Sequence, residues 1–127
     1  MIRKKVLDTG RIRRIGGGFA FIPHRFLTGG FVNALGPDEL LLYLFLVLAA
    51  DRYGLSFYGY DKICSLLQMD LNRYIEARCA LIRQDLIAFD GTVFQVLSLP
   101  PAPMDTKRHE QMGIKKLTDG MLGQVAP

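Results

Sequence analysis

The side chains with the most specific hydrogen-bonding chemistry follow Asp70, at the start of a helix predicted over 70–84. Asp70 is suited to the N-cap position because its carboxylate can accept hydrogen bonds from free first-turn N–H groups. Four of the exposed or half-exposed side chains in the first turn and a half are candidates for base contacts: Leu71, Asn72, Arg73 and Glu76. An Asn amide matches the edge of adenine, and an Arg guanidinium matches the edge of guanine. If this helix presents its start to a DNA groove, these four residues are the candidate base-reading positions.

Sets of residues that could carry catalysis are not found in the sequence. The two histidines, His24 and His109, lie in different terminal regions, and the acidic residues are spread singly. No HExxH, nucleophile-elbow or Walker pattern occurs. Cys64 and Cys79 lack CxxC spacing, so we interpret them as reduced, partly buried thiols. The sequence therefore predicts a binding protein and not an enzyme, with no metal site and no cofactor.

The elements that must position the candidate residues occupy 60–99. The first is a short helix whose apolar stripe is Ile63, Cys64, Leu66 and Leu67. After a tight turn, the helix from Asp70 repeats its apolar positions at helical spacing and turns them towards a core: Tyr74, Ala77, Leu81 and Ile82. Two strands are then predicted, over Leu86–Phe89 and Thr92–Leu97. Asp90-Gly91 between them is a strong hairpin signal.

This order of helix, turn, helix and hairpin resembles the winged helix-turn-helix DNA-binding domains of transcriptional regulators and of plasmid and phage replication initiators. The resemblance depends on the spacing of Asp70, Ala77, Leu81 and Leu86-Ile87, preceded by Leu67-Gln68-Met69. Gln68 stands where the family commonly has a glycine, which tolerates left-handed backbone. The resemblance covers roughly residues 36 to 99. It implies a mainly α fold with a small β-wing (α+β), whose second helix enters the major groove.

Charge is distributed unevenly along the 127 residues, whose formal net charge is +4. Residues 1–14 carry +5, whereas residues 36–99 carry −3. We therefore divide the chain into a basic flexible arm (1–18), a winged-helix domain (19–99) and a C-terminal tail (100–127). Within the domain, residues 19–35 are a lid and residues 36–99 the core. Cationic and hydroxyl side chains suited to phosphate contacts lie on the arm and on the two helices: Arg11, Arg13, Arg14, Tyr60, Lys62 and Arg83.

A further helix is predicted from about Asp38 to Arg52, after the helix-start signal Gly36-Pro37. Its segment Leu40–Ala50 is apolar on every face, which predicts cover on all sides, either by residues 19–35 or by a second subunit. Because helix-turn-helix proteins commonly dimerise, we expect a homodimer. The segment is too short to span a bilayer, which needs about 20 apolar residues. The N-terminus lacks the apolar region of a signal peptide, so a cytoplasmic protein without a membrane partner is expected.

Shorter segments complete the predicted domain. Phe19–Ile22 is a candidate edge strand, and Leu55–Tyr58 is a strand expected to pair with the wing. Residues 24–35 are expected to form a broken helix or two turns, since consecutive glycines weaken a helix. In the tail, a weak apolar stripe can dock on a partner, although a mobile tail is the simpler interpretation. The stripe consists of Ile114, Leu117 and Met121.

Two functions remain open at this point. The first is a sequence-specific double-stranded DNA-binding protein, a transcriptional regulator or a replication or mobile-element accessory, with the helix over 70–84 in the major groove. The alternative is a winged helix used as a protein–protein interaction module, which the acidic core favours, together with a wing tip, Asp90-Gly91-Thr92, that has no Lys or Arg. In that case the arginines of the helix form a solvated face with Glu76 and Asp85: Arg73, Arg78 and Arg83.

Overall fold

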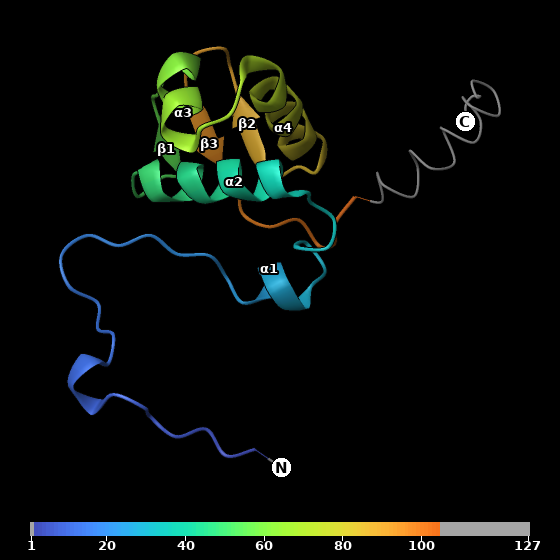
Figure 1. The fold of residues 1–127 in the computed structure, drawn as a ribbon. Helices are drawn as coiled ribbons and strands as arrows, with labels where there is room; N and C mark the ends of the chain where they lie inside the picture. Colours follow the sequence, from blue (N-terminus) through green and yellow to red (C-terminus); the bar gives the residue numbers. More distant parts are fainter. Residues whose placement is uncertain (1, 105–127) are drawn as a thin grey trace.

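The computed structural model describes residues 2–104. It contains a 3-10 turn η1 (Thr9–Arg11), helices α1 (Arg25–Thr28), α2 (Pro37–Ala49), α3 (Tyr60–Leu67) and α4 (Leu71–Arg83), and strands β1 (Leu55–Ser56), β2 (Ile87–Phe89) and β3 (Phe94–Val96). The strands form one antiparallel sheet in the order β1-β3-β2, with α2, α3 and α4 packed around it (Figure 1). The predicted mainly helical α+β fold is confirmed, and its layout is consistent with a winged helix.

Two findings concern the ends of the chain and the membrane. The predicted stripe Ile114, Leu117 and Met121 lies outside the described residues. Over residues 2–104, no helix has both the length and the apolar character that crossing a bilayer requires.

Helix α2 begins as predicted and ends earlier than predicted. Gly36 is its N-cap, Pro37 occupies its first turn, and the Glu39 carboxylate accepts a hydrogen bond from the Gly36 N–H. The helix stops at Ala49 and does not reach Arg52. The reason is Asp51, whose carboxylate accepts from the N–H groups of Tyr53 (2.8 Å) and Leu55 (3.0 Å) and so builds a turn in place of another helical turn.

The lid over residues 19–35 covers one side of α2. Phe26 stacks on Tyr43 of α2 with ring centroids 4.8 Å apart, and Phe31 is fully buried. Arg25 fastens the lid to the end of the domain, because its guanidinium donates to the carbonyls of Leu99 (3.0 Å) and Pro100 (2.8 Å). Short α1 followed by turns matches the predicted broken helix.

The predicted edge strand Phe19–Ile22 is wrong, since this segment belongs to no strand. Only Ala20 and Ile22 pack against the core, and Phe19 and Phe21 are exposed. Alternate side chains thus still point inward and outward. However, the next residue is Pro23, which lacks the N–H that a strand needs to extend its ladder.

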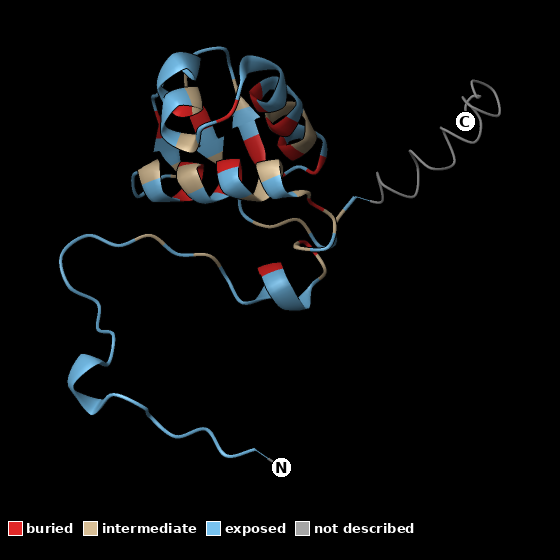
Figure 2. Ribbon diagram, in the orientation of Figure 1, coloured by how far each residue is buried: buried red, intermediate tan, exposed pale blue. Residues whose placement is uncertain are grey.

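The prediction that α2 is covered on every face is wrong for one face. Leu42 and Leu46 are fully buried, but Leu41, Leu44 and Leu48 are exposed by 38%, 45% and 65%. These three recur at helical spacing, and Figure 2 shows exposed positions alternating with buried ones along α2. The lid covers the Tyr43 side only, so a stripe of three leucines is left in contact with solvent.

The α3–turn–α4 unit follows the sequence closely. Asp70 is the N-cap of α4, and its carboxylate accepts from the Arg73 N–H at 2.8 Å, as predicted. Gln68 takes the left-handed conformation (φ 55°, ψ 48°) that the family resemblance assigns to a glycine at this position. The Met69 N–H reaches back to the Cys64 carbonyl at 3.1 Å and closes α3.

The predicted core faces of these two helices are correct except at their edges. Tyr74, Ala77 and Leu81 are buried, but Ile82 is 41% exposed. A residue advances about 100° around an α-helix, so Ile82 turns away from the core that Leu81 fills. Leu66 of α3 is 54% exposed for a related reason: it lies on the flank of the stripe centred on Ile63, where no element within residues 2–104 covers it.

The hairpin forms at the predicted place with shorter strands. Phe89 of β2 pairs with Phe94 of β3, and their rings stack with centroids 4.2 Å apart. In the loop, Gly91 has φ +101°, which strongly favours glycine. The Asp90 carboxylate accepts from the N–H groups of Thr92 (2.8 Å) and Val93 (2.7 Å), and these hydrogen bonds lower the pKa of Asp90. The carboxylate therefore serves the loop itself.

Candidate nucleic-acid interface

The start of α4 presents the predicted residues to solvent. Leu71 is 48% exposed, and Asn72 and Glu76 are exposed beside it. Asn72 and Glu76 lie on the side of the helix away from the buried Tyr74 and Ala77, whose packing fixes the rotation of α4. Within residues 2–104 the Asn72 amide has no hydrogen-bond partner, so its donor and acceptor are available to a ligand.

Arg73 is also exposed, but its guanidinium is engaged. Its Nε donates to Oδ2 of Asp38 at 2.9 Å, and its Nη2 donates to Oδ1 at 2.7 Å. This bidentate pair joins the first turn of α4 to the first turn of α2 across 35 positions of sequence. Arg73 can reach a base only by exchanging the Asp38 carboxylate for a base edge. Both ends of the pair lie at the surface, with side chains 48% and 30% exposed.

The pair of Arg73 with Asp38 makes the stability of the folded protein depend on pH. The hydrogen bond from Arg73 lowers the pKa of Asp38 below its ordinary 3.8, so the folded protein releases this proton more readily than the unfolded chain does. The stabilisation is therefore present above about pH 4 and is lost as the pH falls through the pKa of the folded state. We expect Asp38→Asn to lower the unfolding temperature at pH 6 and to make no difference at pH values where both proteins hold a neutral side chain. Thermal unfolding of both proteins between pH 2.5 and 6 measures this, and an equal deficit at every pH would contradict it.

The predicted phosphate-contacting residues are all exposed but are not gathered at one place. Arg11, Arg13 and Arg14 lie on a segment, residues 2–18, that is exposed throughout. Tyr60 and Lys62 occupy the first turn of α3, where Tyr60 is 58% exposed. Arg83 ends α4, about 16 Å along the helix axis from Asn72 at 1.5 Å per residue.

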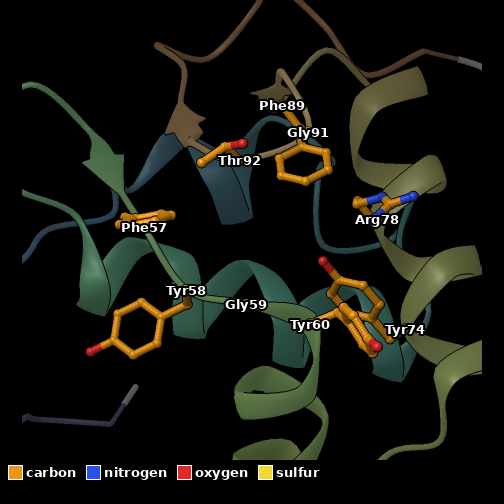
Figure 3. Close-up of a pocket in the computed structure, with 9 residues that line it drawn as sticks. All are labelled: Phe57, Tyr58, Gly59, Tyr60, Tyr74, Arg78, Phe89, Gly91 and Thr92. Carbon is orange, nitrogen blue, oxygen red and sulfur yellow. The ribbon is translucent and has the colours of Figure 1, made fainter.

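A groove between the two helices and the hairpin is the feature that the sequence analysis missed. Its volume is about 490 Å³. Most of the lining is aromatic or glycine, with Arg78 on one wall (Figure 3); the lining residues are Phe57, Tyr58, Gly59, Tyr60, Tyr74, Arg78, Phe89, Gly91 and Thr92. The run Phe57-Tyr58-Gly59-Tyr60 was the sequence signal for it, since consecutive exposed aromatic residues are uncommon on a surface without a ligand.

The interpretation of Arg78 as part of a solvated helix face is wrong. Its guanidinium carbon lies 5.3 Å from the ring centroid of Tyr74 and 4.9 Å from that of Phe89, and the residue is partly buried. Contacts with two aromatic rings hold a guanidinium in one position and keep its N–H groups available at the ring edges. Arg78 is therefore a fixed positive charge within the groove.

A second apolar feature adjoins the start of α4. Leu71, Ile75 and Ile82 are exposed by 48%, 37% and 41% and follow one flank of the helix. An apolar flank on an otherwise polar helix surface suits contacts with methyl groups, such as the one that thymine presents in the major groove. Over residues 2–104, no three His, Cys, Asp or Glu side chains lie close enough together to hold a metal ion.

Neither a known protein family nor a curated protein matches the sequence. Among solved structures, the chain is similar to one described as "Structure of Rep-DNA complex", with 18% sequence identity and a TM-score of 0.45. The similarity covers 75% of this chain and 86% of the other. A similarity this distant bears neither on the fold nor on the function of the present chain.

Proposed function

We propose that the protein is a winged helix-turn-helix protein that binds double-stranded DNA with sequence specificity, as a transcriptional regulator or as a replication or mobile-element accessory. The observation that carries the proposal is the start of α4. Asp70 caps it, buried Tyr74 and Ala77 fix its rotation, and it presents Leu71 and Asn72 to solvent. This is the part of a helix-turn-helix that enters the major groove.

Each exposed side chain of this first turn and a half has a base edge that it suits. Asn72 offers a donor and an acceptor to adenine, Leu71 a methyl contact to thymine, and Glu76 an acceptor to the cytosine amino group. Arg73 is assigned to guanine on the condition that it leaves Asp38. The phosphate contacts are assigned to residues on the arm and on both helices: Arg11, Arg13, Arg14, Tyr60, Lys62 and Arg83.

The direct test is fluorescence anisotropy with a labelled duplex of mixed sequence, titrated at several salt concentrations. Non-specific binding with a Kd of roughly 10⁻⁴ to 10⁻⁶ M that weakens steadily with salt is expected. Removal of residues 1–18 is expected to weaken it. Absence of binding even at low salt would overturn the proposal.

One observation favours the second candidate function, a protein–protein interaction module. The domain over residues 36–99 is acidic, and the hairpin tip carries Asp90 and no cation. DNA affinity depends largely on Lys and Arg, so this distribution suits an interaction with a basic protein surface. The two functions are separated by sequence preference, because a protein-interaction module with the basic arm over 1–18 can bind any duplex but prefers no sequence.

We further propose that the protein is a homodimer that pairs through the leucine stripe of α2. Leu41, Leu44 and Leu48 form an exposed apolar stripe at helical spacing, which a second copy can cover by a two-fold contact. Sedimentation equilibrium at micromolar concentration is expected to give twice the 14.3 kDa chain mass. Leu44→Asp is expected to give the monomer, whereas Leu27→Asp, at an exposed lid position outside the stripe, leaves the dimer intact. A wild-type monomer throughout the concentration range would contradict the dimer.

A further inference from the structure

The aromatic groove has ring faces that no part of the described chain covers. Phe57 is 73% exposed and Tyr60 is 58% exposed, although both line the groove. Tyr58 is different, because its ring meets Phe45 of α2 edge to face at 5.1 Å and so anchors the segment to the domain. Figure 3 shows Phe57 on one side of the open space and Tyr60 and Arg78 on the other. Two large aromatic faces on opposite sides of one groove form a platform for planar ligands.

The charge of the groove points to an anionic ligand. Arg78 is held over Tyr74 and Phe89, and Phe89 is held in turn by its stack on Phe94. None of the lining residues carries a carboxylate. The carboxylate of Asp90, next to Gly91 in the hairpin loop, is already bonded to two loop N–H groups. The remaining polar atoms of the lining side chains are hydroxyls, which also donate to phosphate oxygens.

The groove is also open enough for a chain to pass. A Cβ built on Gly91 would meet no atom within 4 Å, so the hairpin tip leaves free space beside the groove. Planar rings, a fixed guanidinium and an open path are the combination by which proteins bind single strands: successive bases stack on aromatic side chains, and cations follow the backbone. Bases within a duplex are stacked on one another and cannot offer their faces to Phe57 or Tyr60.

We propose that this groove binds single-stranded DNA, with bases stacked on Phe57 and Tyr60 and a phosphate held by Arg78. This site is separate from the start of α4 and goes beyond the proposed duplex binding. It does not depend on sequence readout, because every base has a face on which an aromatic ring can stack. A protein with both sites can bind a duplex and, beside it, a strand that has been unpaired.

The test is anisotropy with a labelled oligothymidylate of about 15 nucleotides, alongside the mixed-sequence duplex. Phe57→Leu is expected to bind the single strand roughly tenfold more weakly, since each base–aromatic stack contributes substantially to affinity. Its affinity for the duplex is expected to change by less than about threefold. The matched control is Tyr53→Leu, which removes a ring that is 65% exposed and outside the groove, and which should bind like wild type. Circular dichroism checks that each variant is folded.

A second measurement uses protein without substitutions, so its result does not depend on whether a variant folds. In protein labelled with 3-fluorotyrosine, the ¹⁹F resonance of Tyr60 is expected to shift on addition of the oligothymidylate, and that of Tyr53 is not. The proposal is overturned if wild type does not bind the single strand, if Phe57→Leu binds it equally, or if the single-strand and duplex affinities of Phe57→Leu fall together. A proline-rich peptide is added in a parallel titration. The proposal is also overturned if the peptide shifts the Tyr60 resonance and the oligothymidylate does not, because the groove would then be a peptide site. Single-strand binding without duplex binding would support this site and refute the proposed duplex reader.

Discussion

Alanine in place of Asn72 is expected to abolish most of the discrimination at one base pair of the DNA site. A well-placed bidentate contact is worth about 1–3 kcal/mol against the wrong base, so the preference at that position should fall by roughly tenfold or more. Affinity for unrelated duplex should change far less, because an Asn amide contributes little to phosphate binding. The fold should be unaffected, since Asn72 is exposed and its amide has no hydrogen-bond partner within residues 2–104.

The measurement compares the Kd for a selected site with the Kd for the same site changed at one base pair. Gln95→Ala is the matched control, because it removes a side-chain amide from an exposed position on β3, outside α4. Arg73→Ala is compared in the wild-type and the Asp38→Asn backgrounds. If Arg73 reads a base, its removal costs discrimination in both, and Asp38→Asn alone strengthens binding. Equal loss from Asn72→Ala and Gln95→Ala would contradict the role of Asn72.

The second large effect is expected from the arm. Replacement of Arg11, Arg13 and Arg14 by alanine removes three charges from a segment that is exposed throughout. If each cation displaces one condensed counterion, the slope of log Kobs against log salt should become shallower by about 2–3. Binding to all sequences should weaken alike, by roughly tenfold to a hundredfold at low salt, because phosphate contacts carry no sequence information.

Anisotropy titrations over a range of salt concentrations measure this slope. Arg52→Ala is the control, since this arginine is exposed and its guanidinium lies 5.0 Å from the ring centroid of Tyr53, outside the groove and away from α4. An unchanged slope and affinity in the triple variant would show that the arm takes no part in binding.

The features that could be predicted from the sequence are those with local causes. Asp70 is recognisable as a cap because the hydrogen bond it accepts comes from only three residues away. The hairpin follows from Asp90-Gly91, since a positive φ at Gly91 and a carboxylate that binds the next N–H groups are properties of the two residues themselves. The family resemblance pointed to the left-handed turn position, and Gln68 adopts it.

The features that could not be predicted depend on contacts between distant segments. The pair of Arg73 with Asp38 spans 35 positions and requires the relative placement of α2 and α4. Arg78 lies four residues after Tyr74, on the same side of α4, but only the hairpin brings Phe89 over it. The exposed face of α2 could not be predicted either. All residues of Leu40–Ala50 are apolar, so helical periodicity does not indicate which side the lid leaves uncovered.

The claim that α4 reads duplex DNA is tested most directly by selection from a random-sequence duplex library at moderate salt. Wild type is expected to enrich a defined motif, and Asn72→Ala is expected to lose the preference at one position of it while the rest remains. If wild type enriches no motif, the start of α4 does not read bases. In that case the acidic domain, with its uncovered leucine stripe on α2, is a protein-interaction module.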